Sequence, residues 1–159
     1  MNAPMNTFDR DLLVVLHDVA RLIRTRFDQR ARGYGMTRAQ WIILARLSRQ
    51  PGMSQNELAT ICEVEPISVG RLVDRLELRG MVERRPDPTD RRVKRLHLLP
   101  AAEPILAEIT RSREYLDAEI TEGLHGPARE ALVDALLHIK MKLNAEPDDD
   151  GAKLVMAGE

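Results

Sequence analysis

The stretch over residues 54–98 constrains the fold most, because local signals in it define where two short helices begin and end. Ser54 can cap a helix, and Glu57 three residues later completes an S-x-x-E capping box. Pro66 suits a first helical turn, where its missing N–H costs no hydrogen bond, and Gly80 is a typical helix stop. The sequence therefore predicts helices over about residues 55–62 and 66–79.

Two short runs with the alternation of β-strands follow, at residues 81–85 and 93–98. Between them stands P-D-P-T-D-R-R, a segment rich in residues that form turns. We predict a β-hairpin over about residues 81–98 with a long, charged tip.

Apolar residues recur every three or four positions on both sides of this stretch, which is the spacing of a buried helix face. The pattern predicts a helix over 7–32, a second helix between Thr37 and Pro51, and two long helices within 100–145. The acidic residues 146–159 contain Gly and Pro and are predicted to form a flexible tail. No linker is long enough to divide residues 7–145, so we predict one domain.

Composition excludes several classes of protein. The chain of 159 residues is 43 % apolar and 31 % charged, which excludes a disordered chain, and it has no apolar run near the ~18 residues of a membrane span. Its single cysteine excludes intrachain disulfides and cysteine-rich zinc modules, and its four histidines include no i, i+4 pair. We expect no metal, no cofactor and no membrane partner. The N-terminus shows no export signal, so a cytoplasmic location is expected.

Two short helices joined by a tight connection and followed by a hairpin match a winged helix-turn-helix. The predicted fold class is therefore mainly α (α+β), with a two-stranded wing. The net charge is −1, from 24 basic and 25 acidic residues, but residues 84–95 hold six basic side chains against two acids, a local charge of +4. Such a patch is either a solvated surface or a phosphate-binding site, and its place after a candidate recognition helix favours DNA.

Five motifs support a family resemblance. They are M-T-R-A-Q-W-I-I-L at 36–44, S-Q-N-E-L-A at 54–59, R-L-V-D-R-L-E-L-R-G-M-V-E-R at 71–84, D-P-T-D-R-R-V-K-R-L-H-L at 87–98 and A-E-P-I-L-A-E at 102–108. Over about residues 8–143 the chain resembles the MarR family of bacterial transcription regulators, and its SlyA-like branch looks closest. The resemblance implies a homodimer whose helices over 7–32 and 100–145 interleave, with the helix-turn-helix at about 54–79. It also implies that two winged domains bind successive major grooves of a pseudo-palindrome in double-stranded DNA.

The resemblance places the recognition helix at 66–79 and suggests which residues contact DNA. Arg71 presents a planar fork that can pair with guanine, although a phosphate contact or a solvated position is the alternative. Val69 either touches a thymine methyl group or packs inward, and Ser54 is a cap, a phosphate contact or both. The full set of expected DNA contacts is Ser54, Gln55, Pro66, Ser68, Val69, Arg71, Arg75, Arg91 and Lys94.

On the wing, the resemblance directs Arg91 toward the minor groove or its phosphates. It pairs Arg92 with Asp74 of the recognition helix, which would hold the wing at a fixed angle, and it leaves Asp90 to brace the hairpin turn. Many relatives carry a basic residue where this chain has Thr89. We therefore expect Arg91 and Lys94 to make more of the wing's contact with DNA.

Relatives often bind small aromatic acids between their dimer helices and winged domain. Arg21, Tyr34 and Trp41 are the candidate residues for binding such an effector, and a core position is the alternative for Trp41. Some branches of the family sense oxidants through a cysteine in the first helix. Cys62 lies elsewhere, beside Ile61 and Val64, so we predict a packed and inert thiol.

The sequence predicts a DNA-binding regulator that represses or counter-silences transcription. An enzyme is not expected, because there is no Gly-rich phosphate loop, nucleophile elbow or zinc helix motif. The alternative is a winged-helix protein-interaction module without specific DNA readout. The set of Asp74, Asp90, Arg91 and Arg92 argues against that alternative, because a protein that did not bind DNA would have little use for a braced basic wing.

Overall fold

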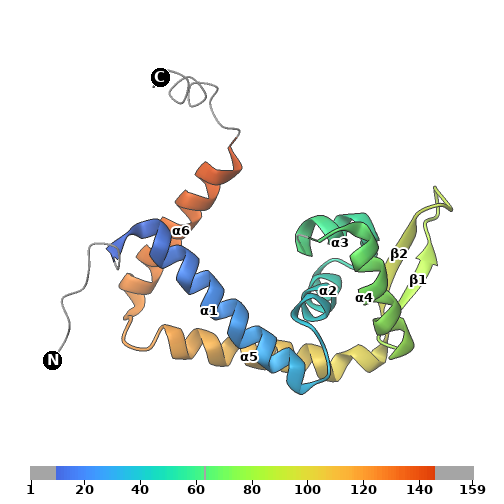
Figure 1. The fold of residues 1–159 in the computed structure, drawn as a ribbon, viewed down its shortest axis with the longest axis horizontal. Helices are drawn as coiled ribbons and strands as arrows, with labels where there is room; N and C mark the ends of the chain where they lie inside the picture. The colour runs from blue at the N-terminus through green and yellow to red at the C-terminus, as the bar shows by residue number, and fades with distance from the viewer. Residues whose placement is uncertain (1–9, 63, 146–159) are drawn as a thin grey trace, which may run out of the picture. The chain divides into compact units, whose positions relative to one another are not determined.

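The computed structural model describes residues 10–62 and 64–145, and the predicted mainly α fold with a two-stranded wing is confirmed. In chain order the elements are α1 (Leu12–Gly33), α2 (Arg38–Arg49), α3 (Gln55–Cys62), α4 (Pro66–Leu78), β1 (Val82–Pro86), β2 (Lys94–Leu98), a 3-10 turn (Pro100–Ala102), α5 (Glu103–Ile120) and α6 (Gly126–Asn144) (Figure 1). The chain divides into two compact units within α5, between Tyr115 and Leu116.

The helix boundaries follow the local signals in the sequence. Ser54 and Glu57 form the predicted capping box, since Ser54 Oγ accepts from Glu57 N at 3.3 Å and Glu57 Oε2 accepts from Ser54 N at 2.6 Å. Pro66 opens α4 as predicted. Gly80 follows that helix at φ 66°, a left-handed conformation that glycine adopts without steric cost. These signals are local, so they operate before any tertiary contact forms.

The first helix differs from its predicted range at its start. It begins at Leu12, because the Asp11 carboxylate caps it by accepting from Leu13 N at 3.0 Å and Val14 N at 3.1 Å. Residues 7–9 of the predicted helix and the predicted tail at 146–159 lie outside the described residues. Among the helices that the structure describes, none has both the length and the hydropathy that a membrane crossing requires.

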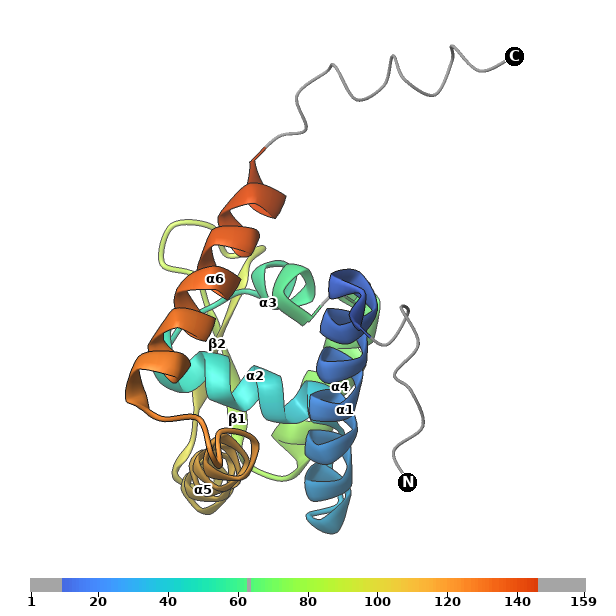
Figure 2. The ribbon, with the colours of Figure 1, turned by 90° about the vertical axis from the view of Figure 1, so that its left-hand side faces the viewer.

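Helix α2 lies at the centre of the winged part of the chain, and α1, α3, α4 and β2 all contact it (Figure 2). Its residues Ile43, Leu44 and Leu47 are fully buried. Around them the core contains apolar residues of every neighbouring element, including Leu58, Val69, Val73, Leu76, Val82 and Leu96. The helix-turn-helix and the hairpin therefore share one core.

The hairpin is tied to the segment before α3 as well as to itself. In its antiparallel register, Val82 pairs with Leu98 and Arg84 pairs with Leu96. Gly52 N donates to Leu96 O and Leu96 N donates to Met53 O, both at 2.9 Å, so the chain before α3 runs along the free edge of β2. This pairing fixes the wing to the N-terminus of α3.

Candidate nucleic-acid interface

Helix α4 presents one polar side to solvent and one apolar side to the core. Ser68, Arg71 and Arg75 are exposed, and neither arginine has an ion-pair partner among the described residues. Pro66 is exposed on the first turn. The arrangement leaves the N-terminal half of α4 open to a ligand that accepts hydrogen bonds.

Val69 is the exception among the predicted contacts on this helix. Its side chain is fully buried and belongs to the apolar core with Val73 and Leu76. The prediction that Val69 contacts DNA is therefore wrong, and its alternative of packing inward is what the structure shows. The reason is helical geometry, since positions 69, 73 and 76 lie on one face at 3.6 residues per turn.

Arg84 of β1 joins the wing to both helices of the helix-turn-helix. Its Nε donates to Gln55 Oε1 of α3 at 2.9 Å, and its Nη2 donates to Asp74 Oδ1 of α4 at 2.8 Å. Its Nη1 pairs with the Glu77 carboxylate, whose Oε1 also accepts from Arg84 N at 3.1 Å. The side chain is 21 % exposed. A charge this far from water needs several partners, and Arg84 has them.

The predicted ion pair between Arg92 and Asp74 is wrong in this structure. Asp74 pairs with Arg84, whereas Arg92 pairs with Asp90 two residues before it, with both of its contacts to that carboxylate at 3.0 Å. The Arg92 side chain is 91 % exposed. Arg84 is the nearer partner because it stands on the strand that packs on α4. The guanidinium that fixes the wing to the recognition helix is that of Arg84 and not that of Arg92.

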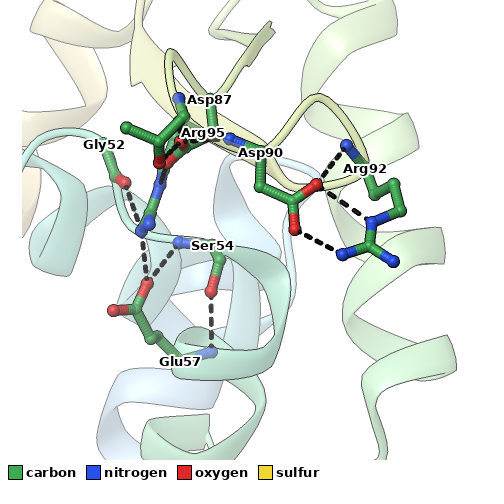
Figure 3. A network of polar contacts seen from close by, with 8 residues as sticks. Gly52, Ser54, Glu57, Asp87, Asp90, Arg92 and Arg95 are labelled. Atoms are coloured by element: carbon green, nitrogen blue, oxygen red, sulfur yellow. Dashed lines mark hydrogen bonds and ion pairs between the residues drawn. The ribbon is translucent and has the colours of Figure 1, made fainter.

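A second guanidinium ties the wing to α3, as Figure 3 shows. Arg95 of β2 donates from Nε to Asp87 Oδ2 at 2.7 Å and from Nη1 to Glu57 Oε2 at 3.1 Å. Its Nη1 also lies 3.3 Å from Gly52 O. Glu57 thus serves both the helix cap and the wing. The hydrogen bonds from Ser54, followed by the Arg95 charge, lower the pKa of the Glu57 carboxyl below its ordinary value.

Asp87 organises the tip of the wing. Its Oδ1 accepts from Thr89 Oγ1 at 2.6 Å, Thr89 N at 2.8 Å and Asp90 N at 3.0 Å, while Oδ2 faces Arg95. These bonds, led by the one from the Thr89 hydroxyl, hold the pKa of the Asp87 carboxyl far below its ordinary range. Asp90 braces the turn as well, because its Oδ1 accepts from Arg92 N at 3.0 Å. Thr89 therefore has a structural role in the tip.

The wing holds fewer available positive charges than its sequence suggests. Four of its six basic residues are ion-paired, namely Arg84, Arg85, Arg92 and Arg95. Arg91 and Lys94 are exposed and have no such partner among the described residues. These two side chains, with Arg71 and Arg75 of α4, are predicted DNA contacts, and they are the ones free to bind phosphate or base edges.

A hollow of about 290 Å³ separates the start of α3 from β2. Ser54, Gln55 and Asn56 line one side of it, and the other side consists of residues 92–94. Lys94 and the start of α3 line this hollow together, and the N-terminus of a helix together with a cation suits a phosphate group. Gln55 keeps its amide nitrogen available, since only its Oε1 accepts from Arg84. The predicted contacts Ser54, Gln55 and Lys94 thus lie together.

Sequence reasoning missed the bridging roles of Arg84, Arg95, Asp87 and Glu77, because it counted the arginines as surface charge. One signal was available for Arg84. In a strand, residues two apart share a face, so Arg84 lies on the same side as the buried Val82 and opposite Leu96. A charged residue on the core side of a hairpin must find partners on the element packed there. No comparable signal identified Asp87.

The three effector candidates do not come together at one site. Trp41 is buried and lines a hollow of about 250 Å³ with Phe27, Arg38 and Ile109. Tyr34 contacts Trp41 with ring centroids 6.0 Å apart but does not line this hollow, and Arg21 pairs with Asp18 at the surface of α1. Trp41 Nε1 and Arg38 Nε are buried without a hydrogen-bond partner among the described residues. Arg24 and Arg38, and not Arg21, are the cations that line this hollow.

Cys62 packs against the apolar core and is partly buried. Burial raises the pKa of its thiol, which reduces the share of the reactive thiolate. The structure therefore supports the prediction of a packed thiol over that of a redox sensor. In the part of the chain that the structure describes, no cluster of three or more metal-ligating side chains is present.

The helix-turn-helix and most of the wing match a known family. The model of the MarR family matches residues 34–93, so the resemblance predicted from the sequence is confirmed over this segment. Among solved structures, the transcriptional regulator PA3341 is 29 % identical with a TM-score of 0.74, and the match covers 84 % of this chain and 98 % of that chain.

Two further structures are similar. The transcriptional repressor CouR, bound to a 23-mer DNA duplex, is 26 % identical with a TM-score of 0.73, and the match covers 88 % of this chain and 99 % of that chain. The transcriptional regulator SlyA is 22 % identical with a TM-score of 0.73, covering 84 % of this chain and 94 % of that chain. This last likeness shows the fold alone, so the SlyA-like branch stays a prediction.

The depressed pKa of Asp87 makes a prediction about stability and pH. A carboxyl whose pKa is lower in the folded chain stabilises the fold above its unfolded pKa, about 3.9, and this contribution is lost as the pH falls through the folded pKa. We expect the native chain to exceed Asp87→Asn in free energy of unfolding at pH 7. The difference should stay constant to about pH 4 and shrink below it.

Urea unfolding followed by the fluorescence of Trp41, the only tryptophan, measures this difference. Asp134→Asn is the matched control, because Asp134 is exposed on α6 and has no ion pair among the described residues. A difference between native chain and Asp87→Asn that is unchanged at about pH 2 would contradict the prediction.

Proposed function

We propose that this chain, which matches the MarR-family model over residues 34–93, binds double-stranded DNA sequence-specifically and regulates transcription. It acts in the cytoplasm as a homodimer, and as a repressor or counter-silencer, on pseudo-palindromic operators. One observation supports this most. Four exposed cations without an ion-pair partner among the described residues, Arg71 and Arg75 on α4 and Arg91 and Lys94 on the wing, lie on the two elements that contact DNA in a winged helix-turn-helix.

The proposal assigns different roles to these side chains. Ser68 and Arg71, on the first turns of α4, read base edges in the major groove, where a guanidinium fork pairs with guanine O6 and N7. Arg75 lies one turn further along and contacts phosphate. Arg91 at the wing reaches the minor groove or its phosphates, while the start of α3 at Ser54 and Gln55 and the nearby Lys94 hold the backbone.

The homodimer is supported by apolar side chains that nothing covers in one chain. None of the 19 residues of α6 is buried. Large exposed apolar residues stand on α1 and α6, and they are Leu12, Leu13, Val15, Val19, Leu22, Leu132, Val133, Leu136, Leu137, Met141 and Leu143. Apolar surface of this extent marks an interface, and a second copy of the chain supplies a matching surface.

Fluorescence-anisotropy titration of the full chain against its own upstream DNA, with a scrambled duplex as control, tests the proposal. We expect binding to exceed the scrambled control by ~10³-fold or more, with a steep dependence on salt and two chains per duplex. Half-site centres should lie about 10 base pairs apart. If the chain shows no preference for the upstream DNA, its binding sites are selected from random sequences. Equal binding to all sequences would favour the protein-interaction module.

Replacing Arg71 separates base readout from phosphate binding. We expect Arg71→Ala to weaken operator binding by ~1–3 kcal/mol and to relax base preference at one position in each half-site, because one bidentate pair is lost. Competition binding against single-base operator variants measures this preference. Equal losses on all sequences would show that Arg71 contacts only phosphate.

Arg91→Ala is the matched control for Arg71→Ala, since both side chains are exposed cations without an ion-pair partner among the described residues. Loss of a phosphate contact should lower affinity on every sequence and reduce the salt slope by about one. An unchanged salt slope for Arg91→Ala would remove Arg91 from the interface.

A small aromatic acid is the proposed effector, and the hollow beside Trp41 supports it. Its exposed lining is almost entirely apolar, with Phe27, Trp41 and Ile109 around the space and two cations, Arg24 and Arg38, among the lining residues. Arg38 Nε lies 3.5 Å from Asp28 Oδ1 and makes no hydrogen bond, and Trp41 Nε1 also lacks one. An aromatic ring suits the walls, and a carboxylate suits these donors.

Titration of the full chain with benzoate, followed by Trp41 fluorescence, checks this effector site. We expect saturable quenching, and Arg38→Ala should weaken binding by ~1.5–3 kcal/mol, which is typical of a charged hydrogen bond. Arg21→Ala is the control and should have no effect, because Arg21 does not line the hollow. Quenching that is absent, or equal in all three proteins, would contradict the assignment.

A further inference from the structure

Ile67 of the recognition helix is a large aliphatic side chain that does not pack against the core. It is 71 % exposed, although the apolar residues Val69, Val73 and Leu76 of the same helix are fully buried. It is the second residue of α4, directly after Pro66. A single exposed aliphatic side chain is ordinary on a protein surface, but this one stands on the first turn of the helix that a helix-turn-helix places against base edges.

The direction of Ile67 follows from helix geometry. At about 100° per residue, Val69, Val73 and Leu76 centre on one side of α4, while Ile67, Arg71 and Leu78 lie almost opposite. Ile67 and Arg71 are four residues apart, one above the other on the exposed face. Ile67 therefore lies on the same side of α4 as Arg71.

Position along the helix separates Ile67 from Leu78. Leu78 is 87 % exposed but is the last residue of α4, ~16 Å further along the axis. In a helix-turn-helix, the N-terminal residues of the recognition helix contact base edges. Ile67 therefore lies in the half of the helix that reads bases, and Leu78 lies beyond it.

We propose that Ile67 is a specificity-determining residue that contacts the C5-methyl group of a thymine in each half-site. This inference rests on the proposed function. An isoleucine cannot hydrogen-bond to phosphate or to a base edge, and burying a polar edge against it leaves that edge unsatisfied. The thymine methyl is the one apolar group in the code of the major groove.

The contact predicts the character of the operator. Thymine is favoured over cytosine at the Ile67 position, because cytosine has no methyl group and would bury its N4 donor against the side chain. Arg71 lies one helical turn away, or about two base-pair steps along the duplex. Each half-site therefore places a guanine for Arg71 within about two steps of that thymine.

The test uses operators selected from random DNA by the full-length native chain. Each thymine is replaced in turn by deoxyuridine, which differs only by the missing C5-methyl group. We expect one thymine per half-site at which deoxyuridine weakens binding of the native chain about fourfold, the value of one buried methyl-sized group. With Ile67→Ala, that same replacement should have no effect.

Leu78→Ala is the matched control, since it also removes an exposed aliphatic side chain from this face of α4. It should keep the full deoxyuridine effect. If Ile67→Ala keeps the effect too, or if no thymine is sensitive in a specifically bound operator, the inference is overturned and the proposed function stands. If the native chain selects no sequence, the proposed function fails and the inference fails with it.

Discussion

Arg84 is the contact on which the geometry of the interface depends. Its guanidinium reaches from the first strand of the wing to Gln55 on α3 and to Asp74 and Glu77 on α4. Removing it would leave two carboxylates facing each other without a counter-charge beside the recognition helix. Breaking one partner of a partly buried ion pair is more destabilising than the net value of the pair. The position of the wing on α4 thus depends on Arg84, whose side chain is only 21 % exposed.

Ion pairs within the wing and its neighbouring helices also explain which cations of this nearly neutral chain stay unpaired. Acidic side chains on this part of the molecule are used internally, with Glu57 and Asp87 on Arg95, Asp90 on Arg92, and Asp74 and Glu77 on Arg84. They fix the arginines that hold the wing. Arg71, Arg75, Arg91 and Lys94 stay exposed without an ion-pair partner among the described residues. In the proposed function, base specificity depends on few side chains, with polar Ser68 and Arg71 beside apolar Ile67.

The apolar residues form two sets, one that is buried around α2 and one that is exposed on α1 and α6. Residues of α2 gather the helix-turn-helix and the hairpin around one core. On α6 no residue is buried within one chain, and on α1 only Ala31 is. In the proposed homodimer, the helix-turn-helix and the hairpin share one core, and the second copy sets the spacing between the two winged parts. An effector in the hollow between α1, α2 and α5 would act by changing that spacing, and only by as much as it favours one dimer geometry.

The sequence by itself determined the order of the elements and the bounds of the two helices of the helix-turn-helix, because caps, prolines and glycines act through neighbours a few residues away. The capping box at Ser54 and Glu57, the start at Pro66 and the stop at Gly80 needed no tertiary contact. Only the tertiary structure decided the partners. Val69 is buried in the core. Asp74 pairs with Arg84, whereas Arg92 pairs within the wing tip. Arg38 lies beside Trp41, where Arg21 was expected. The sequence does not distinguish between arginines in one short segment. The packing of the strand on the helix decides which of them reaches a given carboxylate.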